Sequence, residues 1–216
     1  MASGFRAVDQ IETMWRVATT LNRRAAMSNA RATGLPPMFF VTDRARTPDP
    51  CAIAQRLPRG AGVIYRAFGE EDALLTALSL GRIARARGLI LLIGADVDLA
   101  AKCGAHGVHL PERSVHWAPR VRARHPDWLI TGAAHSARAL HNANGAGLDA
   151  ALVSAVFPSL SPSAKRALTP VRFARLTAQT RLPVYALGGV NVSTAPRLLP
   201  TGAAGLAAVD AFTPPV

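Results

Sequence analysis

The sequence predicts a (β/α)8 barrel, and three observations favour this α/β fold. Eight short apolar segments follow one another at intervals of about 20 to 30 residues, the length of one strand–helix unit. Each carries apolar side chains at consecutive positions, as do parallel strands covered on both faces. Eight such units in 216 residues match a small (β/α)8 barrel, whereas a doubly wound open sheet, the structural alternative, rarely needs eight evenly spaced strands. The predicted strands are residues 38–42, 62–65, 89–93, 107–110, 128–131, 150–154, 183–187 and 205–209.

The segments between these strands have the period of amphipathic helices. We expect helices over residues 71–87, 96–103, 136–144 and 169–179. Only residues 210–216 follow the last predicted strand. The eighth outer helix is therefore expected to be truncated.

Residues 8–25 predict a further helix ahead of the first strand, because apolar side chains recur there every three or four positions. The apolar stripe consists of Ile11, Trp15, Ala18 and Leu21. We therefore divide the chain into an N-terminal helical extension, residues 1–36, and a barrel, residues 37–216. The extension is expected to pack beside the first and last strands, in place of the missing helix. The alternative is that it caps the bottom of the barrel.

Composition excludes several classes of protein. Half of the residues are hydrophobic and 18% are charged, which excludes an intrinsically disordered chain. No run of 18 apolar residues predicts a transmembrane helix, so no membrane partner is expected. Two cysteines, Cys51 and Cys103, do not make a disulfide framework, and we expect a cytoplasmic protein.

The charge balance indicates an anionic partner, because 25 basic residues face 13 acidic ones. A field of this sign attracts both nucleic acids and phosphorylated metabolites. The arginines are scattered, and the aromatic residues, 6% of the chain, do not alternate with them as a base-stacking surface requires. We therefore favour a small phosphorylated metabolite over a nucleic acid and leave the oligomeric state open.

Glycines near the last two strands predict a phosphate site. Gly188 and Gly189 stand where the seventh strand meets its loop, and Gly202 stands beside the eighth strand. Loops at these two strands bind phosphate in many barrels, and glycine lets the backbone approach a ligand closely. The alternative for each glycine is an ordinary tight turn.

Other candidate residues lie near predicted strand ends, where barrel enzymes carry their chemistry. Arg66 ends the second strand, and its guanidinium suits a phosphate. His109 and His135 lie near the ends of the fourth and fifth strands, and an imidazole either donates to phosphate or transfers protons. Ser159 and Ser161 follow the sixth strand and supply hydroxyl groups. The alternative for the histidines is a purely structural role.

A series of motifs runs along the predicted barrel, at residues 40–43, 96–100, 104–110, 134–136, 156–159, 186–189 and 201–203. In their order and spacing these motifs resemble the thiamine phosphate synthase family, which also includes the thiazole tautomerases. The resemblance implies a small (β/α)8 barrel. It also implies coupling of a thiazole phosphate to a pyrimidine methyl diphosphate with release of pyrophosphate, aided by Mg²⁺ and cationic groups.

The chain departs from this family where the diphosphate and the metal bind. Of the Gln, Arg and Lys that alternate along the family's second strand, the Arg matches Arg66, while the other two positions hold Ile64 and Phe68. The family's Asn-Asp after the third strand reads Gly94-Ala95.

The departures continue after the fourth and sixth strands. The family's Gly-Gln-Glu-Asp after the fourth strand is replaced by residues 111–114, Pro-Glu-Arg-Ser. Its Thr-x-Thr-Lys after the sixth strand reads Ser-Leu-Ser-Pro at residues 159–162. We therefore assign no metal ligand and no certain cofactor. The alternative is that Asp96 and Glu112 supply carboxylates to Mg²⁺ from shifted positions.

The resemblance implies a thiamine phosphate synthase-like enzyme of thiamine biosynthesis. It would bind thiazole phosphate at Gly188, Gly189 and Gly202, with Arg66 steering the diphosphate. One alternative is a thiazole tautomerase-like enzyme in which His135 is the acid and base. Another is a non-catalytic binder or sensor of a phosphorylated thiamine precursor.

Overall fold

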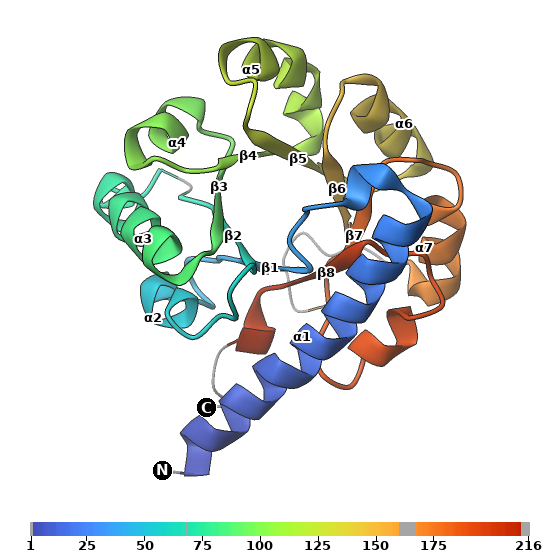
Figure 1. Ribbon diagram of the computed structural model, residues 1–216, viewed down its shortest axis with the longest axis horizontal. Coiled ribbons are helices and arrows are strands. Elements are labelled where there is room, and N and C mark those ends of the chain that lie inside the picture. The colour runs from blue at the N-terminus through green and yellow to red at the C-terminus, as the bar shows by residue number, and fades with distance from the viewer. Residues whose placement is uncertain (1, 68, 160–166, 213–216) are drawn as a thin grey trace.

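A computed structural model describes residues 2–67, 69–159 and 167–212, with side chains from residue 10 onward. Within these residues, eight parallel strands pair in chain order and close into a barrel (Figure 1). The predicted fold is therefore confirmed, and all eight predicted strands are present within a few residues of their expected bounds. The strands are β1 (Met38–Val41), β2 (Gly62–Tyr65), β3 (Ile90–Gly94), β4 (Gly107–Leu110), β5 (Leu129–Ala134), β6 (Ala150–Val153), β7 (Val184–Ala186) and β8 (Gly205–Ala208).

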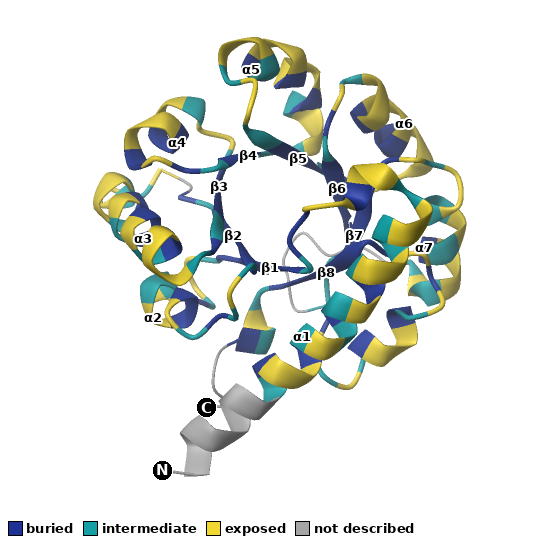
Figure 2. Cartoon of the chain, viewed as in Figure 1, coloured by how far each residue is buried: buried dark blue, intermediate teal, exposed yellow. Residues whose placement is uncertain are grey.

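Helices surround the barrel, with their exposed faces turned outward and the strands buried within (Figure 2). All five predicted helices are found. The α-helices are α1 (Ala2–Ser28), α2 (Pro50–Ala54), α3 (Ala73–Arg87), α4 (Val97–Cys103), α5 (Ala118–Arg124), α6 (Ala137–Gly145) and α7 (Thr169–Thr177). The 3-10 helices are η1 (Ala30–Ala32), η2 (Glu112–Trp117), η3 (Ala195–Leu198) and η4 (Asp210–Phe212).

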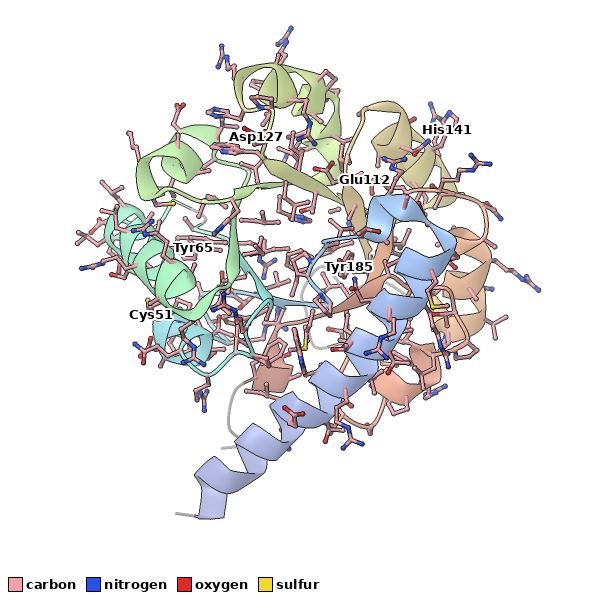
Figure 3. All side chains as sticks on the ribbon, in the orientation of Figure 1. Cys51, Tyr65, Glu112, Asp127, His141 and Tyr185 are labelled. Atoms are coloured by element: carbon pink, nitrogen blue, oxygen red, sulfur yellow. The ribbon has the colours of Figure 1, made fainter. Side chains whose placement is uncertain are left out.

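The inside of the barrel is filled by apolar side chains that alternate with the outward-facing ones along each strand. They form one buried cluster that includes Phe39, Ile64, Leu92 and Tyr185. The rings of Phe39 and Tyr185 meet edge to face with centroids 5.0 Å apart, and Figure 3 labels Tyr185 among the side chains that fill the barrel.

The amino-terminal end of the barrel is closed by the segment that leads into β1. Leu35 belongs to the inner cluster, and the Tyr185 hydroxyl donates to the Pro36 carbonyl at 2.6 Å. Because this end is plugged, access to the interior is left to the opposite end, where the strands finish.

Helix α1 takes the place of the missing eighth outer helix. It contacts β8, β1, η3 and η4, and Met14, Ala18 and Leu21 are buried on its inner face. Farther along α1, the Asn22 side-chain amide donates to the carbonyls of Leu35 and Ala204 at 3.3 and 3.2 Å. The helix therefore packs at the junction of the first and last strands and also reaches the plugged end.

The division into an extension and a barrel stays a prediction.

Among the described residues, none of the helices is long and apolar enough to cross a membrane.

Candidate functional site

A chain of alternating charges lies where β1, β2 and β8 end. The Arg66 guanidinium donates from Nε to the Thr42 carbonyl at 2.7 Å and from Nη2 to Asp43 Oδ2 at 3.2 Å. The same Asp43 oxygen accepts from Arg46 at 3.0 Å, and Arg46 also pairs with Asp210 at 3.0 Å. The predicted candidate Arg66 is thus held in place by the first strand of the barrel.

This chain of charges sets the protonation states of its members. The hydrogen bond from Arg46 lowers the pKa of Asp43 despite its partial burial, and the charge of Arg66 adds to the effect. Burial lowers the pKa of Arg66, and Asp43 offsets part of this change, but a guanidinium stays protonated in proteins. The Asp210 carboxylate is paired with Arg46, so its negative charge is partly neutralised.

His109 lies inside the barrel at the end of β4. Its Nδ1 lies 2.9 Å from Thr131 Oγ1, because the register of β4 and β5 sets these two residues side by side. Burial and, to a smaller extent, the charge of Arg66 lower the pKa of His109 to about 4. His109 is therefore neutral at neutral pH.

The lowered pKa of His109 predicts a loss of stability in acid. In acid, His109 binds a proton more readily in the unfolded chain than in the folded one. Its contribution to the free energy of unfolding is therefore fully present above the ordinary histidine pKa of 6.5 and is lost as the pH drops toward 4. The expected loss is on the order of 3 kcal/mol. Urea unfolding of wild type and His109→Asn at pH 7 and pH 4.5 measures it. The loss should shrink in His109→Asn and persist in His141→Asn, which changes an exposed histidine of α6.

His135 follows β5 and is held through both its backbone and its ring. Its N–H donates to Glu112 Oε2 at 2.8 Å, and its Nδ1 lies 2.9 Å from the Ser154 carbonyl oxygen. A carbonyl only accepts hydrogen bonds, so the tautomer that fits has its proton on Nδ1. Nε2 then carries the lone pair and is the basic atom of an exposed side chain.

The loop after β7 is anchored to the loop after β6. The amides of Val156 and Phe157 donate to the carbonyls of Leu187 and Gly188, each at 3.0 Å. Gly188 and Gly189 have φ values of +88° and +65°, and a Cβ on Gly189 would lie 2.3 Å from the Pro158 carbonyl oxygen. Only glycine fits both the conformation and the space here.

The amides of this loop are suited to an anion. Within the part of the chain that the structure describes, the N–H groups of Gly188 and Gly189 have no hydrogen-bond partner. Backbone N–H groups of this kind form phosphate sites in barrels. Of the predicted serines, Ser159 is half-buried on the neighbouring loop, and Ser161 lies outside the described residues.

The placement of Gly202 beside these two glycines is wrong. Gly202 precedes β8, which begins at Gly205, so it lies at the amino-terminal end of the barrel. Its neighbour Thr201 accepts a hydrogen bond there from the Thr177 hydroxyl. Gly202, with a φ of +74°, serves a turn at the end of the barrel opposite to His135.

Comparison with known proteins identifies the family. The model of the family described as thiamine monophosphate synthase matches residues 38–212. The chain belongs to this family. A putative thiamine-phosphate synthase of Geobacter sulfurreducens is 33% identical over 187 residues, which cover 81% of this chain and 85% of the relative. The thiamine-phosphate synthase of Anoxybacillus flavithermus is 29% identical, covering 77% of this chain and 80% of the relative.

A solved structure of the family supports the same fold. The thiamine phosphate pyrophosphorylase from Pyrococcus furiosus superposes with a TM-score of 0.70 and 22% sequence identity. The superposition covers 84% of this chain and 88% of that structure.

The described residues do not fit the Mg²⁺ that the resemblance to the family implies. Asp96 caps α4, because its Oδ1 accepts from the Leu99 amide at 2.8 Å. Glu112 accepts from the His135 amide. No group of three carboxylate, histidine or cysteine side chains that could hold a metal ion occurs among the described residues. The alternative that Asp96 and Glu112 replace the family's metal ligands is therefore not supported.

A cavity of about 700 Å³ opens beside Arg66, between the loops that follow β1 and β2. Tyr65 lies between the barrel and α3 (Figure 3), and its hydroxyl donates to Glu70 Oε2 at 3.2 Å. Burial and the nearby Glu70 charge raise the pKa of Tyr65 to about 12. Neither this cavity nor Arg46 is predictable from the sequence, because neither belongs to a recognisable motif.

Proposed function

We propose that this chain is a thiamine phosphate synthase-like enzyme of thiamine biosynthesis. It binds a thiazole phosphate at the open end of the barrel and couples it to a pyrimidine methyl diphosphate. One observation carries the proposal: the Gly188 and Gly189 amides, the fixed Arg66 guanidinium and a His135 Nε2 with no partner among the described residues all lie where the strands end. Membership of the thiamine monophosphate synthase family supports the same reaction.

The phosphate of the thiazole is assigned to Gly188 and Gly189. Their amides have no partner among the described residues, and a phosphate monoester offers oxygens that accept from N–H groups. The Ser159 hydroxyl, on the adjoining loop, is a further donor. The other end of the thiazole is then directed toward the centre of the opening.

The diphosphate of the pyrimidine substrate is assigned to the part of the opening where Arg66 lies. Breaking the bond between the pyrimidine methyl carbon and the diphosphate oxygen leaves negative charge on the departing group, and a fixed cation stabilises that charge. Arg66 is already oriented by Thr42 and Asp43, so little side-chain entropy is lost when the anion binds.

His135 is assigned to hydrogen bonding at the reacting end of the substrate. With Nδ1 turned to the Ser154 carbonyl, its Nε2 accepts a hydrogen bond. The coupling joins the lone pair of the thiazole nitrogen to the pyrimidine methyl carbon as the diphosphate leaves, so acid–base transfer by His135 belongs to the tautomerase-like alternative. The proposal includes a cytoplasmic location and a small phosphorylated metabolite as the binding partner, as the sequence predicts.

The decisive experiment combines binding and turnover. Purified protein is mixed with thiazole phosphate, pyrimidine methyl diphosphate and Mg²⁺, and thiamine phosphate is measured by fluorescence after oxidation. Thermal melting is recorded with thiazole phosphate and with the thiazole alcohol that lacks the phosphate. We expect turnover. We also expect thiazole phosphate to raise the melting temperature and the thiazole alcohol to leave it unchanged. Stabilisation without turnover would replace the proposal by the tautomerase-like enzyme or the binder, and no response to either ligand would overturn it.

A further inference from the structure

Three successive carbonyl groups in the loop after β7 are held by hydrogen bonds. The carbonyls of Leu187 and Gly188 accept from amides of the loop after β6, each at 3.0 Å. The third carbonyl, that of Gly189, accepts from the Thr194 hydroxyl at 2.9 Å. Because the peptides between these residues are trans, each N–H points away from the carbonyl of its own peptide. Fixing the three carbonyls therefore also fixes the directions of three N–H groups.

The three oriented N–H groups belong to Gly188, Gly189 and Val190. None of them has a hydrogen-bond partner among the described residues. Val190 is 5% exposed, and a backbone donor that is shielded from water costs free energy when it is left unpaired. The Val190 amide therefore lacks an acceptor, as the two glycine amides do.

Thr194 is held by a network within its own loop. The side-chain oxygen of Asn191 accepts from the amides of Ser193 and Thr194 at 2.9 and 3.1 Å. The Thr194 hydroxyl accepts from the Asn191 amide at 2.9 Å, and its single proton is directed to a carbonyl. The Gly189 carbonyl is the nearest acceptor at 2.9 Å, whereas the two Asn191 oxygens lie at 3.4 Å. The hydroxyl therefore ties the start of this loop to its end.

We propose that Thr194 is the positioning residue of the phosphate site, and that the Val190 amide, which it orients, is a third phosphate donor. Thr194 acts through the peptide between Gly189 and Val190 and does not itself contact the phosphate. The inference rests on the proposed function, because it deepens the assignment of the thiazole phosphate to this loop. Three N–H groups that are oriented before the ligand arrives bind a phosphate monoester with a smaller loss of backbone entropy.

Removal of the Thr194 hydroxyl tests the positioning role. Thr194→Val keeps the size and branching of the side chain but leaves the Gly189 carbonyl without its donor, so that phosphate binding must order the loop. The KM for thiazole phosphate in the coupling reaction should rise at least about tenfold, while kcat and the KM for the pyrimidine methyl diphosphate should change by less than about threefold. Thr194→Ser keeps the hydroxyl and should restore the KM for thiazole phosphate to within about threefold of wild type.

Thr180→Val is the matched control at the other end of β7. Thr180 Oγ1 accepts from the Leu182 amide at 3.0 Å, ahead of the strand, so this change removes a hydroxyl that also holds a turn. It should leave both KM values unchanged. A Thr194→Val protein that melts at a lower temperature but keeps the wild-type KM for thiazole phosphate would overturn the positioning role and leave the proposed function intact.

Nuclear magnetic resonance of the wild-type protein tests the third donor without a substitution. Titration of isotope-labelled protein with thiazole phosphate should shift the amide proton signals of Gly188, Gly189 and Val190 downfield, because each amide gains a charged acceptor. Shifts of the two glycine signals without a shift of the Val190 signal would overturn this inference alone. The absence of a shift at all three amides would overturn the proposed phosphate site, and the inference with it.

Discussion

Gly189→Ala is expected to abolish the stabilisation by thiazole phosphate and to destabilise the fold by about 2–4 kcal/mol. The new methyl group would lie 2.3 Å from the Pro158 carbonyl oxygen and 2.8 Å from Phe157 Cβ. Alanine is also strained at the φ of +65° found here. The loop after β7 must move away from the loop after β6, and its amides leave the position that we assign to the phosphate. Thermal melting with and without thiazole phosphate measures both effects.

Gly147→Ala is the matched control for this experiment. Gly147 also has a positive φ, +77°, but nothing lies within 4 Å of the position of a Cβ there. It should cost about 1 kcal/mol from backbone strain alone and leave the ligand response unchanged. A Gly189→Ala protein that still responds fully to the ligand would remove this loop from the proposed site.

Arg66→Gln is expected to lower kcat/KM for the coupling reaction by at least about 100-fold, equivalent to about 2.7 kcal/mol of transition-state stabilisation. Glutamine keeps some hydrogen-bonding capacity but removes the cation that stabilises the departing diphosphate. It also releases Asp43, whose negative charge then stays at the opening beside Arg46. The affinity for inorganic pyrophosphate, measured by calorimetry, should fall in parallel.

Arg44→Gln separates this local effect from a general loss of charge. Arg44 lines the same cavity but is exposed to solvent, where a charge is strongly screened. It should change kcat/KM by less than about threefold. If the two variants behave alike, or if Arg66→Gln keeps wild-type kinetics, Arg66 has no specific part in the reaction.

The sequence predicted the barrel well because the signal for each strand is local. Runs such as residues 89–93 are apolar on both sides, which only a doubly covered strand accommodates. Helix α2, with five residues, was not predicted because it is too short to show a helical period. Helix α5 has seven residues, as many as the predicted α4, but of these residues just Ala118 and Val121 are buried, so its apolar period is weak. β5 extends to Ala134, beyond its expected end at residue 131, because it continues to pair with β6.

The candidate site was less predictable because it depends on contacts between distant segments. Arg46 and Asp210 are 164 positions apart, and they meet only when the barrel closes between β8 and β1. The contact between the His135 ring and the Ser154 carbonyl forms only when the loops after β5 and β6 pack against each other. The expected position of Gly202 is wrong because this residue comes before β8 begins at Gly205, and a residue that precedes a strand lies at the amino-terminal end of that strand.

The position of α1 bears on how the chain folds while it is being synthesised. This helix is synthesised before the strands of the barrel, yet its apolar face packs on β8 and η4, which come more than 170 residues later in the chain. Contacts of such sequence separation slow folding. The buried leucine and methionine side chains of α1 therefore lack their final contacts until β8 and η4 have been made.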